Sequence, residues 1–403
     1  MGAEPKMKPF TVLVTRIEAL KLIEANTKPL TRTEEVQLDE AAGRILALDV
    51  VAGFNVPPFD RASMDGYAVK ATDTASIPSR LRLIGARHAG EPYEGEVKPG
   101  VCLEIATGSP LPKGADAVVM VEDTKLTGDM VEIHKMAKPW DNIAPEGEDI
   151  KKGEIAVKAG EYITPGKVGA AAALGYSKLK IYSRPRIAIY STGTEIASQG
   201  EQLKPGQIYD INSFTLSAVI EANGCTPVRR GLAKDNEETL RLAVKDAAGH
   251  DVAVFSGGSS VGSKDLLGGV VSELGRVYFH GVQIKPGKPT LFGEVDGAPV
   301  FGMPGYPTSC LSNAYIFLAP ALRKVARLPP AEPHIIIASL TKPLRNTSGR
   351  EQFYTVLVEN GNVAPVFKQS GDITSMAYAN GYIIMPIDSA YGKGDTVTVH
   401  LLD

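Results

Sequence analysis

The second half of this 403-residue chain alternates apolar strand patterns with amphipathic helix patterns, which restricts the folds available to it. Ile187–Tyr190 and Val252–Phe255 are continuous apolar runs, typical of strands covered on both faces. Helical spacing appears over 212–223 and over 236–248. Further strands are expected at 277–284 and 290–293. The alternation predicts an α/β domain built on a mostly parallel sheet with helices on both faces.

Glycine-rich and polar loops follow these strands. Ser191-Thr-Gly-Thr-Glu195 comes after the first strand and Ser256–Asp265 after the second, while Ile284–Pro289 and Gly302–Ser309 are two more such loops. Parallel sheets bind ligands at the carboxyl ends of their strands, and glycine lets backbone N–H groups approach an anion closely. Several strand-end loops therefore indicate one binding site.

Charged residues in these loops suggest what is bound. Lys285 and Lys288 carry positive charge, and Asp265 offers a hard oxygen ligand. The combination favours a phosphorylated ligand with assistance from a metal ion. The two lysines are also consistent with ordinary solvated charges on the surface. Asp235 has an alternative role as well, because together with Glu238 it fits a capping box at the start of the 236–248 helix.

The chain before residue 186 is organised differently. A helix is expected over 11–26, and four short strands are expected between residues 51 and 151, followed by an alanine-rich segment. The four strands are Arg80–Ile84, Val101–Ile105, Ala117–Val121 and Met130–His134. We interpret the region as a β module inserted into a domain made of two sequence pieces.

The last 70 residues read as a separate β-barrel or sandwich. Five strands are expected there, and Asn360-Gly361 is a typical hairpin turn. The expected strands are His334–Ser339, Gln352–Glu359, Val363–Val366, Gly381–Pro386 and Thr396–Leu401. The whole division is 27–50 with 152–182 as an elongated linker domain, 51–151 as the inserted β domain, 10–26 with 183–330 as the α/β domain, and 331–403 as the C-terminal β domain.

Composition excludes several classes of protein. With 43% hydrophobic and 22% charged residues the chain is typical of a soluble globular protein, and a net charge of −3 argues against nucleic acid as a partner. No apolar run is long enough for a membrane span, and the N-terminus lacks a secretory signal, so we expect a cytoplasmic protein. Cys102, Cys225 and Cys310 have neither zinc nor disulfide spacing and are expected to be buried.

Seven motifs, in order along the chain, resemble those of the molybdopterin molybdenumtransferase family, which includes MoeA and the gephyrin E domain. The longest is Pro57-Pro-Phe-Asp-Arg-Ala-Ser-Met-Asp-Gly-Tyr-Ala68. Composition alone favours a rigid turn in which Asp60 and Asp65 cap backbone groups. The others are Ala106-Thr-Gly-Ser-Pro110, Gly147-Glu-Asp149, Ser191-Thr-Gly-Thr-Glu195, Ser256-Gly-Gly-Ser-Ser-Val-Gly262, Lys285-Pro-Gly-Lys-Pro289 and Met303-Pro-Gly-Tyr-Pro307.

The resemblance implies a late step of molybdenum cofactor assembly. Adenylylated molybdopterin and molybdate are the implied substrates, with Mg²⁺-dependent release of AMP. It also implies a central α/β domain of the MoaB/MogA type, an inserted β domain and a C-terminal β-barrel-like domain. A homodimer whose site is shared between subunits, with transient contacts to other cofactor-biosynthesis proteins, is expected on the same ground.

The resemblance also implies roles for individual residues. The implied catalytic residues are Asp65, Thr107, Asp149, Glu195, Asp265 and Lys285. The implied ligands of a metal ion are Asp235, Asp265 and Glu195. Residues implied to bind the substrate are Gly257, Gly258, Ser259, Lys288, Pro304, Gly305, Pro307 and Ser370.

Five positions depart from the family's usual pattern. Arginine is usual where this chain has Ala144, and a compact amide is usual where it has Tyr306. The other departures are Thr194, Ser263 and Asp372. They leave two alternatives open. The first is a divergent paralogue that inserts tungsten, since tungstate has the charge and shape of molybdate, and the second is a non-catalytic molybdopterin-binding or scaffold protein.

Overall fold

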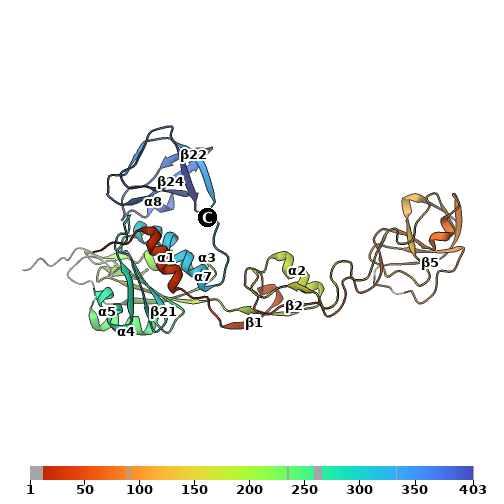
Figure 1. Ribbon diagram of the computed structural model, residues 1–403, viewed down its shortest axis with the longest axis horizontal. Coiled ribbons are helices and arrows are strands. Elements are labelled where there is room, and N and C mark those ends of the chain that lie inside the picture. Colours follow the sequence, from red (N-terminus) through yellow and green to blue (C-terminus); the bar gives the residue numbers. More distant parts are fainter. Residues whose placement is uncertain are drawn as a thin grey trace, which may run out of the picture. The chain divides into compact units, whose positions relative to one another are not determined.

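The computed structural model describes residues 12–88, 90–91, 93–233, 236–257, 266–332 and 334–402. The chain forms two compact units (Figure 1). The larger unit comprises the described residues of Met1–Glu34, Gly43–Ile45 and Tyr182–Asp403, and the smaller comprises those of Glu35–Ala42 and Leu46–Ile181. The finer division into four domains stays a prediction. Within the described ranges, every helix is too short or too polar to traverse a lipid bilayer.

The smaller unit contains a six-stranded sheet in the order β7-β4-β6-β5-β9-β8. All four strands expected between residues 51 and 151 are present in it, as β5, β6, β7 and β9. Its strands are β4 (Gly66–Val69), β5 (Ser79–Arg87), β6 (Val101–Ile105), β7 (Ala117–Met120), β8 (Thr124–Thr127) and β9 (Met130–Ile133), with the short 3₁₀ helices Ala71–Thr74 and Val121–Asp123.

A second core of the smaller unit is built from two sequence segments. Leu46 and Val50 pack with Val157, Ala171 and Ile181, so residues on both sides of the inserted sheet share one cluster. The elements are β1 (Thr33–Gln37), a 3₁₀ turn (Leu38–Glu40), β2 (Val50–Val51), β11 (Ile155–Val157), α2 (Pro165–Ala173) and β12 (Lys178–Tyr182), and β3 (Arg61–Ala62) pairs with β10 (Ile143–Ala144).

The larger unit is built on a six-stranded sheet in the order β16-β13-β17-β21-β20-β18. The first four strands are mutually parallel, whereas β20 and β18 are added antiparallel, which confirms the mostly parallel α/β fold. The strands are β13 (Arg186–Thr192), β16 (Thr226–Ala233), β17 (Val252–Ser256), β18 (Arg276–His280), β20 (Leu291–Val295) and β21 (Ala298–Met303).

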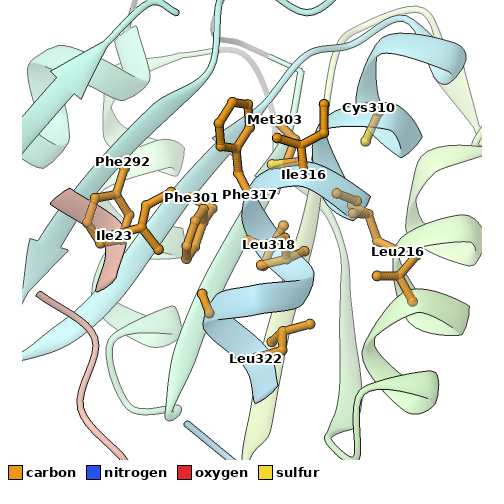
Figure 2. Packing of buried hydrophobic residues seen from close by; sticks show 14 of the residues in the cluster. Ile23, Leu216, Phe292, Phe301, Met303, Cys310, Ile316, Phe317, Leu318 and Leu322 are labelled. Carbon is orange, nitrogen blue, oxygen red and sulfur yellow. The ribbon is translucent and has the colours of Figure 1, made fainter. Parts of the chain in front are cut away.

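Helices cover both faces of this sheet, because its buried strands direct alternate side chains to opposite sides. Ile187 and Ile189 join the core cluster that includes residues of α1, α3 and α7, whereas Ala188 and Tyr190 join the cluster under α4 and α5. Figure 2 shows the first cluster, where Phe301 of the sheet packs among residues of the covering helices. The helices are α1 (Arg16–Asn26), α3 (Asn212–Ala222), α4 (Glu237–Ala247), α5 (Leu266–Leu274), α6 (Pro307–Asn313), a π-helical turn (Ala314–Leu318) and α7 (Ala319–Val325).

The expected start of the first helix is wrong: it begins at Arg16 rather than residue 11, because Thr15 and Glu18 form a reciprocal capping box. Helix α4 begins at Glu237 and is capped by Asn236, whose side chain accepts a hydrogen bond from the Thr239 N–H over 2.9 Å. Asp235 itself lies outside the described residues.

The C-terminal region is a closed five-stranded barrel, because β24 pairs with both β25 and β26 and so completes the ring through β22 and β28. The short strand β19 (Ile284–Lys285) of the α/β region adds to β24 in parallel. The elements are β22 (Ile335–Leu340), β23 (Leu344–Arg345), β24 (Glu351–Glu359), β25 (Asn362–Pro365), α8 (Thr374–Ala377), β26 (Gly381–Met385), β27 (Ala390–Tyr391) and β28 (Thr396–Leu401).

Candidate active site

A cavity of about 960 Å³ lies in the larger unit, at the carboxyl ends of β13 and β17. This is where ligands of parallel sheets bind. The ends of these strands and the loops after them contribute 191–193, 195–196 and 256–257, and the barrel contributes Arg350 and Phe367–Ser370. Further walls come from 208–212, 285–289, 304–307 and Ser309. The short parallel strands β14 (Ile196–Ala197) and β15 (Ile208–Tyr209) lie at 196 and 208–209.

Two carboxylates line the cavity. The buried Ser191 hydroxyl donates to Oδ2 of Asp210 over 2.7 Å, and the Ser213 N–H donates to Oδ1 over 3.0 Å, so Asp210 is fixed at the start of α3. The Glu195 carboxylate folds over Gly193, where an added Cβ would lie 2.7 Å from Oε1. Both groups offer the oxygen ligands that Mg²⁺ prefers.

Asn212 joins three walls of the cavity. Its Nδ2 donates to the Ser256 hydroxyl over 2.7 Å and to the Gly305 carbonyl over 2.8 Å. The side chain comes from α3, the hydroxyl from the end of β17 and the carbonyl from the loop before α6. One buried amide therefore fixes the relative positions of these segments.

The Lys285-Pro-Gly-Lys-Pro289 loop supplies cationic side chains, since Lys285 and Lys288 both line the cavity. The loop is held from behind by Asn313, which is fully buried and donates to the Gly287 carbonyl over 2.8 Å and to the Thr290 hydroxyl over 2.5 Å. Gly287 has φ of 100°, and a Cβ there would lie 2.3 Å from Nδ2 of Asn313. Glycine is required at this position for both reasons.

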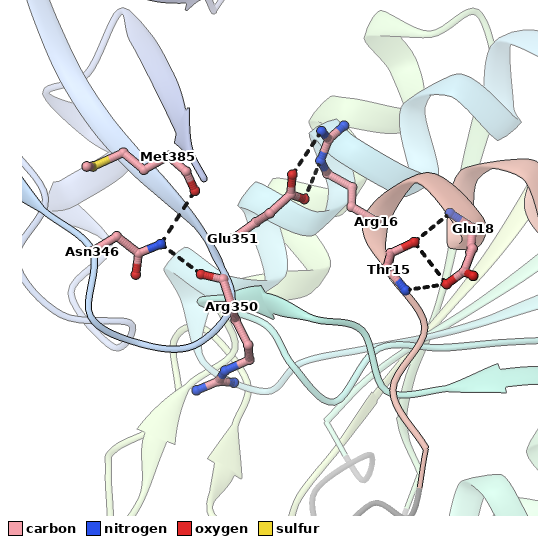
Figure 3. A network of polar contacts seen from close by, with 7 residues as sticks. All are labelled: Thr15, Arg16, Glu18, Asn346, Arg350, Glu351 and Met385. Atoms are coloured by element: carbon pink, nitrogen blue, oxygen red, sulfur yellow. Dashed lines mark hydrogen bonds and ion pairs between the residues drawn. The ribbon is translucent and has the colours of Figure 1, made fainter. Parts of the chain in front are cut away.

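The barrel supplies a further cation, Arg350, beside this loop in the fold. Figure 3 shows how its backbone is fixed: the buried Asn346 donates to the Arg350 carbonyl over 2.8 Å and lies 3.5 Å from the Met385 carbonyl. The next residue, Glu351, forms an ion pair with Arg16 of α1 at 2.8 Å (Figure 3). The start of β24 is thus anchored to the barrel on one side and to the α/β region on the other.

The structure brings together many of the residues expected at the site. Those that line the cavity are Glu195, Gly257, Lys285, Lys288, Pro304, Gly305, Pro307 and Ser370. Gly258, Ser259, Asp235 and Asp265 lie outside the described residues. Their catalytic and binding roles stay predictions.

Asp65, Thr107 and Asp149 belong to the smaller unit and are exposed there. Asp65 accepts two hydrogen bonds at Oδ1, from the Thr107 backbone N–H over 2.6 Å and from its hydroxyl over 2.8 Å. These bonds, the backbone one first, hold the pKa of Asp65 below its ordinary value. The Asp149 N–H donates to the Val56 carbonyl over 3.0 Å.

Sequence reasoning missed several cavity residues, among them the charged side chains Asp210, Arg350 and Lys368. Asp210 directly precedes the 212–223 helix pattern, and an acid there marks both a helix start and a strand-end loop. Arg350 follows Ser348-Gly349 just before an expected strand. The position of each residue in the sequence, next to an expected helix or strand, indicated that it lies at the edge of a sheet.

The departures from the family pattern fall in different places. Tyr306 lines the cavity and is 66% exposed, whereas Ala144 is buried in β10. Thr194 is exposed, and the Asp372 carbonyl accepts a hydrogen bond from the Thr308 hydroxyl over 2.9 Å. Ser263 lies outside the described residues.

The cysteines are structural, as expected. All three are buried and free, and burial raises the pKa of the Cys310 thiol to about 12. Cys310 lies 3.9 Å from the Ser256 hydroxyl, and its raised pKa favours the thiol, which is a weaker nucleophile than the thiolate. Among the described residues there is no cluster of three or more His, Cys, Asp or Glu side chains that could hold a metal ion unaided.

Comparison with known proteins identifies the family to which this fold and cavity belong. Three family models match in order: the MoeA N-terminal region (domain I and II) at residues 14–175, a probable molybdopterin binding domain at 188–324, and the MoeA C-terminal region (domain IV) at 338–402. The chain belongs to the MoeA family.

Individual relatives agree with this assignment. A molybdopterin molybdenumtransferase of Haemophilus influenzae is 34% identical over 387 residues, covering 92% of this chain and 95% of the relative. One from Bacillus subtilis is 34% identical over 389 residues, covering 92% and 90%. The crystal structure of a molybdopterin biosynthesis MoeA protein from Pyrococcus horikosii superposes with a TM-score of 0.84 at 39% identity, covering 97% of this chain and 99% of that one.

Proposed function

We propose that this protein is a molybdopterin molybdenumtransferase that inserts molybdate-derived metal into adenylylated molybdopterin and releases AMP. Its family makes it a transferase of molybdenum cofactor biosynthesis. The observation that carries the finer proposal is the charge arrangement of the cavity. Two carboxylates, Glu195 and Asp210, share it with four cationic residues, Lys285, Lys288, Arg350 and Lys368.

The cations suit the anionic substrates. Molybdate is a tetrahedral dianion, and adenylylated molybdopterin carries phosphates, so both require positive charge and directed donors. Arg350 presents a planar fork that binds two oxygens at once, whereas lysines act as point charges. Ser370 adds a hydroxyl on the barrel side. These groups would bind and orient the two substrates in one cavity.

The carboxylates suit Mg²⁺. This ion keeps several waters and binds through one or two carboxylates together with substrate phosphates, so a site with two acids and no larger cluster among the described residues fits it. Glu195 and Asp210 would hold it. When bound, Mg²⁺ neutralises charge on the phosphate that leaves with AMP. Asp210 is pre-oriented for this by the hydroxyl of Ser191 and the N–H of Ser213.

A reconstitution assay tests the proposal. Purified protein is mixed with adenylylated molybdopterin, Mg²⁺ and either molybdate or tungstate, and AMP is measured over time. We expect AMP release that requires Mg²⁺ and one of the oxyanions, and the faster oxyanion identifies the metal. No AMP with either oxyanion would remove the enzymatic proposal.

We also propose that the working form is a cytoplasmic homodimer in which Asp65, Thr107 and Asp149 of one copy serve the cavity of the other. Support comes from the family and from the exposure of these side chains within their own unit. Mixing an Asp65→Asn variant with a Lys285→Gln variant tests it. In a heterodimer, one of the two shared sites would contain neither substitution. We therefore expect the mixture to release more AMP than either variant alone. A monomer in solution with full activity would contradict the shared site.

A further inference from the structure

Tyr306 is an aromatic side chain that the fold positions but does not bury. It is 66% exposed and lines the cavity. It occupies the N-cap position of α6 but makes no side-chain cap hydrogen bond. Its exposure in the cavity therefore has no explanation in the packing of the helix that it precedes.

The backbone under this ring is held at several points. Pro307 follows at the first turn of α6, and the Tyr306 carbonyl accepts the Cys310 N–H over 2.8 Å. The Thr308 N–H donates to the Ser370 carbonyl over 3.1 Å, which ties the loop to the barrel. The ring itself lies against Gly371, where an added Cβ would be 3.7 Å from Cδ1, an ordinary contact distance.

We propose that Tyr306 is a binding residue whose ring stacks on a planar, nitrogen-rich heteroaromatic ring of the ligand. This inference rests on the proposed function and adds the part of the ligand that the cations do not explain. A ring supported by Gly371 and exposed to the cavity loses little side-chain entropy when a ligand stacks on it. Its π-face suits such rings irrespective of their exact hydrogen-bonding pattern.

Two ring systems have this chemistry in an adenylylated pterin: the pterin and the adenine. The experiment separates them with three ligands that share a phosphate but differ in their ring: neopterin phosphate, AMP and ribose 5-phosphate. Dissociation constants are measured by calorimetry for the full-length wild type and for Tyr306→Ala, Tyr306→Phe and Tyr378→Ala. Tyr378 is the matched control, because it is 64% exposed and does not line the cavity.

We expect Tyr306→Ala to weaken one ring-bearing ligand roughly tenfold, while ribose 5-phosphate binds as to the wild type. Weaker neopterin phosphate identifies the pterin as the stacked ring, and weaker AMP identifies the adenine. Tyr306→Phe and Tyr378→Ala should bind as the wild type does, because the first keeps the ring and the second changes a side chain that does not line the cavity.

Three results would overturn stacking by Tyr306 while leaving the proposed function intact. They are unchanged affinities in Tyr306→Ala, an equal loss for all three ligands, and a loss in Tyr306→Phe as large as in Tyr306→Ala. Melting temperatures of all variants, measured alongside, show whether an equal loss comes from a damaged loop. If the wild type bound none of the ligands, the proposed function would fail, and the stacking role with it.

Discussion

Thr107 donates twice to a single oxygen of Asp65, through its backbone N–H at 2.6 Å and its hydroxyl at 2.8 Å. The pair joins the Pro57–Ala68 segment to the Ala106–Pro110 loop within the smaller unit. The two bonds lower the pKa of Asp65 and fix the orientation of its carboxylate, although the side chain is exposed. The same two hydrogen bonds are expected whether Asp65 takes part in catalysis or only caps a turn. Measurements of activity therefore have to distinguish these two roles.

Removing the Thr107 hydroxyl should raise the pKa of Asp65. Thr107→Val keeps the backbone N–H bond, which is the larger cause of the lowered pKa, so the value should rise only part of the way to normal. Carboxyl NMR titration measures this, with Thr127→Val on a distant strand as control. The lowered pKa stabilises the fold above about pH 4, and that contribution is lost as pH falls through the folded-state value. An unchanged pKa would refute the assignment.

Gly287 should not tolerate alanine. Gly287→Ala places a Cβ 2.3 Å from the Asn313 amide in a residue with φ of 100°, so we expect about 3 kcal/mol of destabilisation in urea unfolding. Gly394→Ala is the matched control, since φ is 91° and no atom lies within 4 Å of the added Cβ. It should cost about 1 kcal/mol from backbone strain alone. Equal losses would mean that the Asn313 contact contributes nothing.

We expect Asn346 to contribute both to the free energy of unfolding and to the affinity for AMP. It is 1% exposed and its amide donates to the carbonyls of Arg350 and Pro386, both at 2.8 Å. Asn346→Ala leaves these buried groups unsatisfied, at about 2–3 kcal/mol, and should weaken binding of AMP by releasing Arg350. Asn362→Ala, at an exposed asparagine, should change stability by less than about 0.5 kcal/mol. If Asn346→Ala lost stability but bound AMP with normal affinity, Asn346 would stabilise the fold without positioning Arg350 for binding.

Asp210 should be needed for Mg²⁺-dependent turnover. Asp210→Asn removes the negative charge while keeping an oxygen that can accept a hydrogen bond from Ser191 or Ser213. We expect AMP release to fall roughly 100-fold and to need more Mg²⁺, with a nearly unchanged melting temperature. Asp296→Asn is the control, because Asp296 is exposed with φ of 50°, which asparagine adopts readily. A large loss of stability would instead make Asp210 mainly a structural residue.

Much of the fold could be predicted from the sequence because its strands are buried on both faces. Val252–Phe255 and its neighbours are apolar without interruption, and Leu240, Ala243 and Val244 of α4 are buried as their spacing predicts. Helix starts were less predictable. Asp235 and Asn236 are both good caps, and only the backbone conformation decides between adjacent candidates.

The site could be predicted where a loop motif carries the side chain and not where tertiary structure supplies it. Lys285 and Glu195 stand in recognisable glycine-rich motifs. Arg350 reaches the cavity only because β24 pairs with β19, a long-range contact that no local pattern contains. The carboxylate of Asp210 is likewise held in the cavity by the hydroxyl of Ser191, which lies 19 residues away.

The pairing of β19 with β24 has a consequence for how this chain can be divided or recombined. Ile284 and Lys285 are aligned with Glu351 and Gln352, and the Glu351 N–H donates to the Gln283 carbonyl over 3.2 Å. The lysine-bearing loop therefore depends on a strand of the barrel for its position. A chimera that exchanged the barrel at the Leu328-Pro-Pro330 junction would pair β19 with a foreign strand next to Lys285, so the barrel has to be exchanged together with this loop.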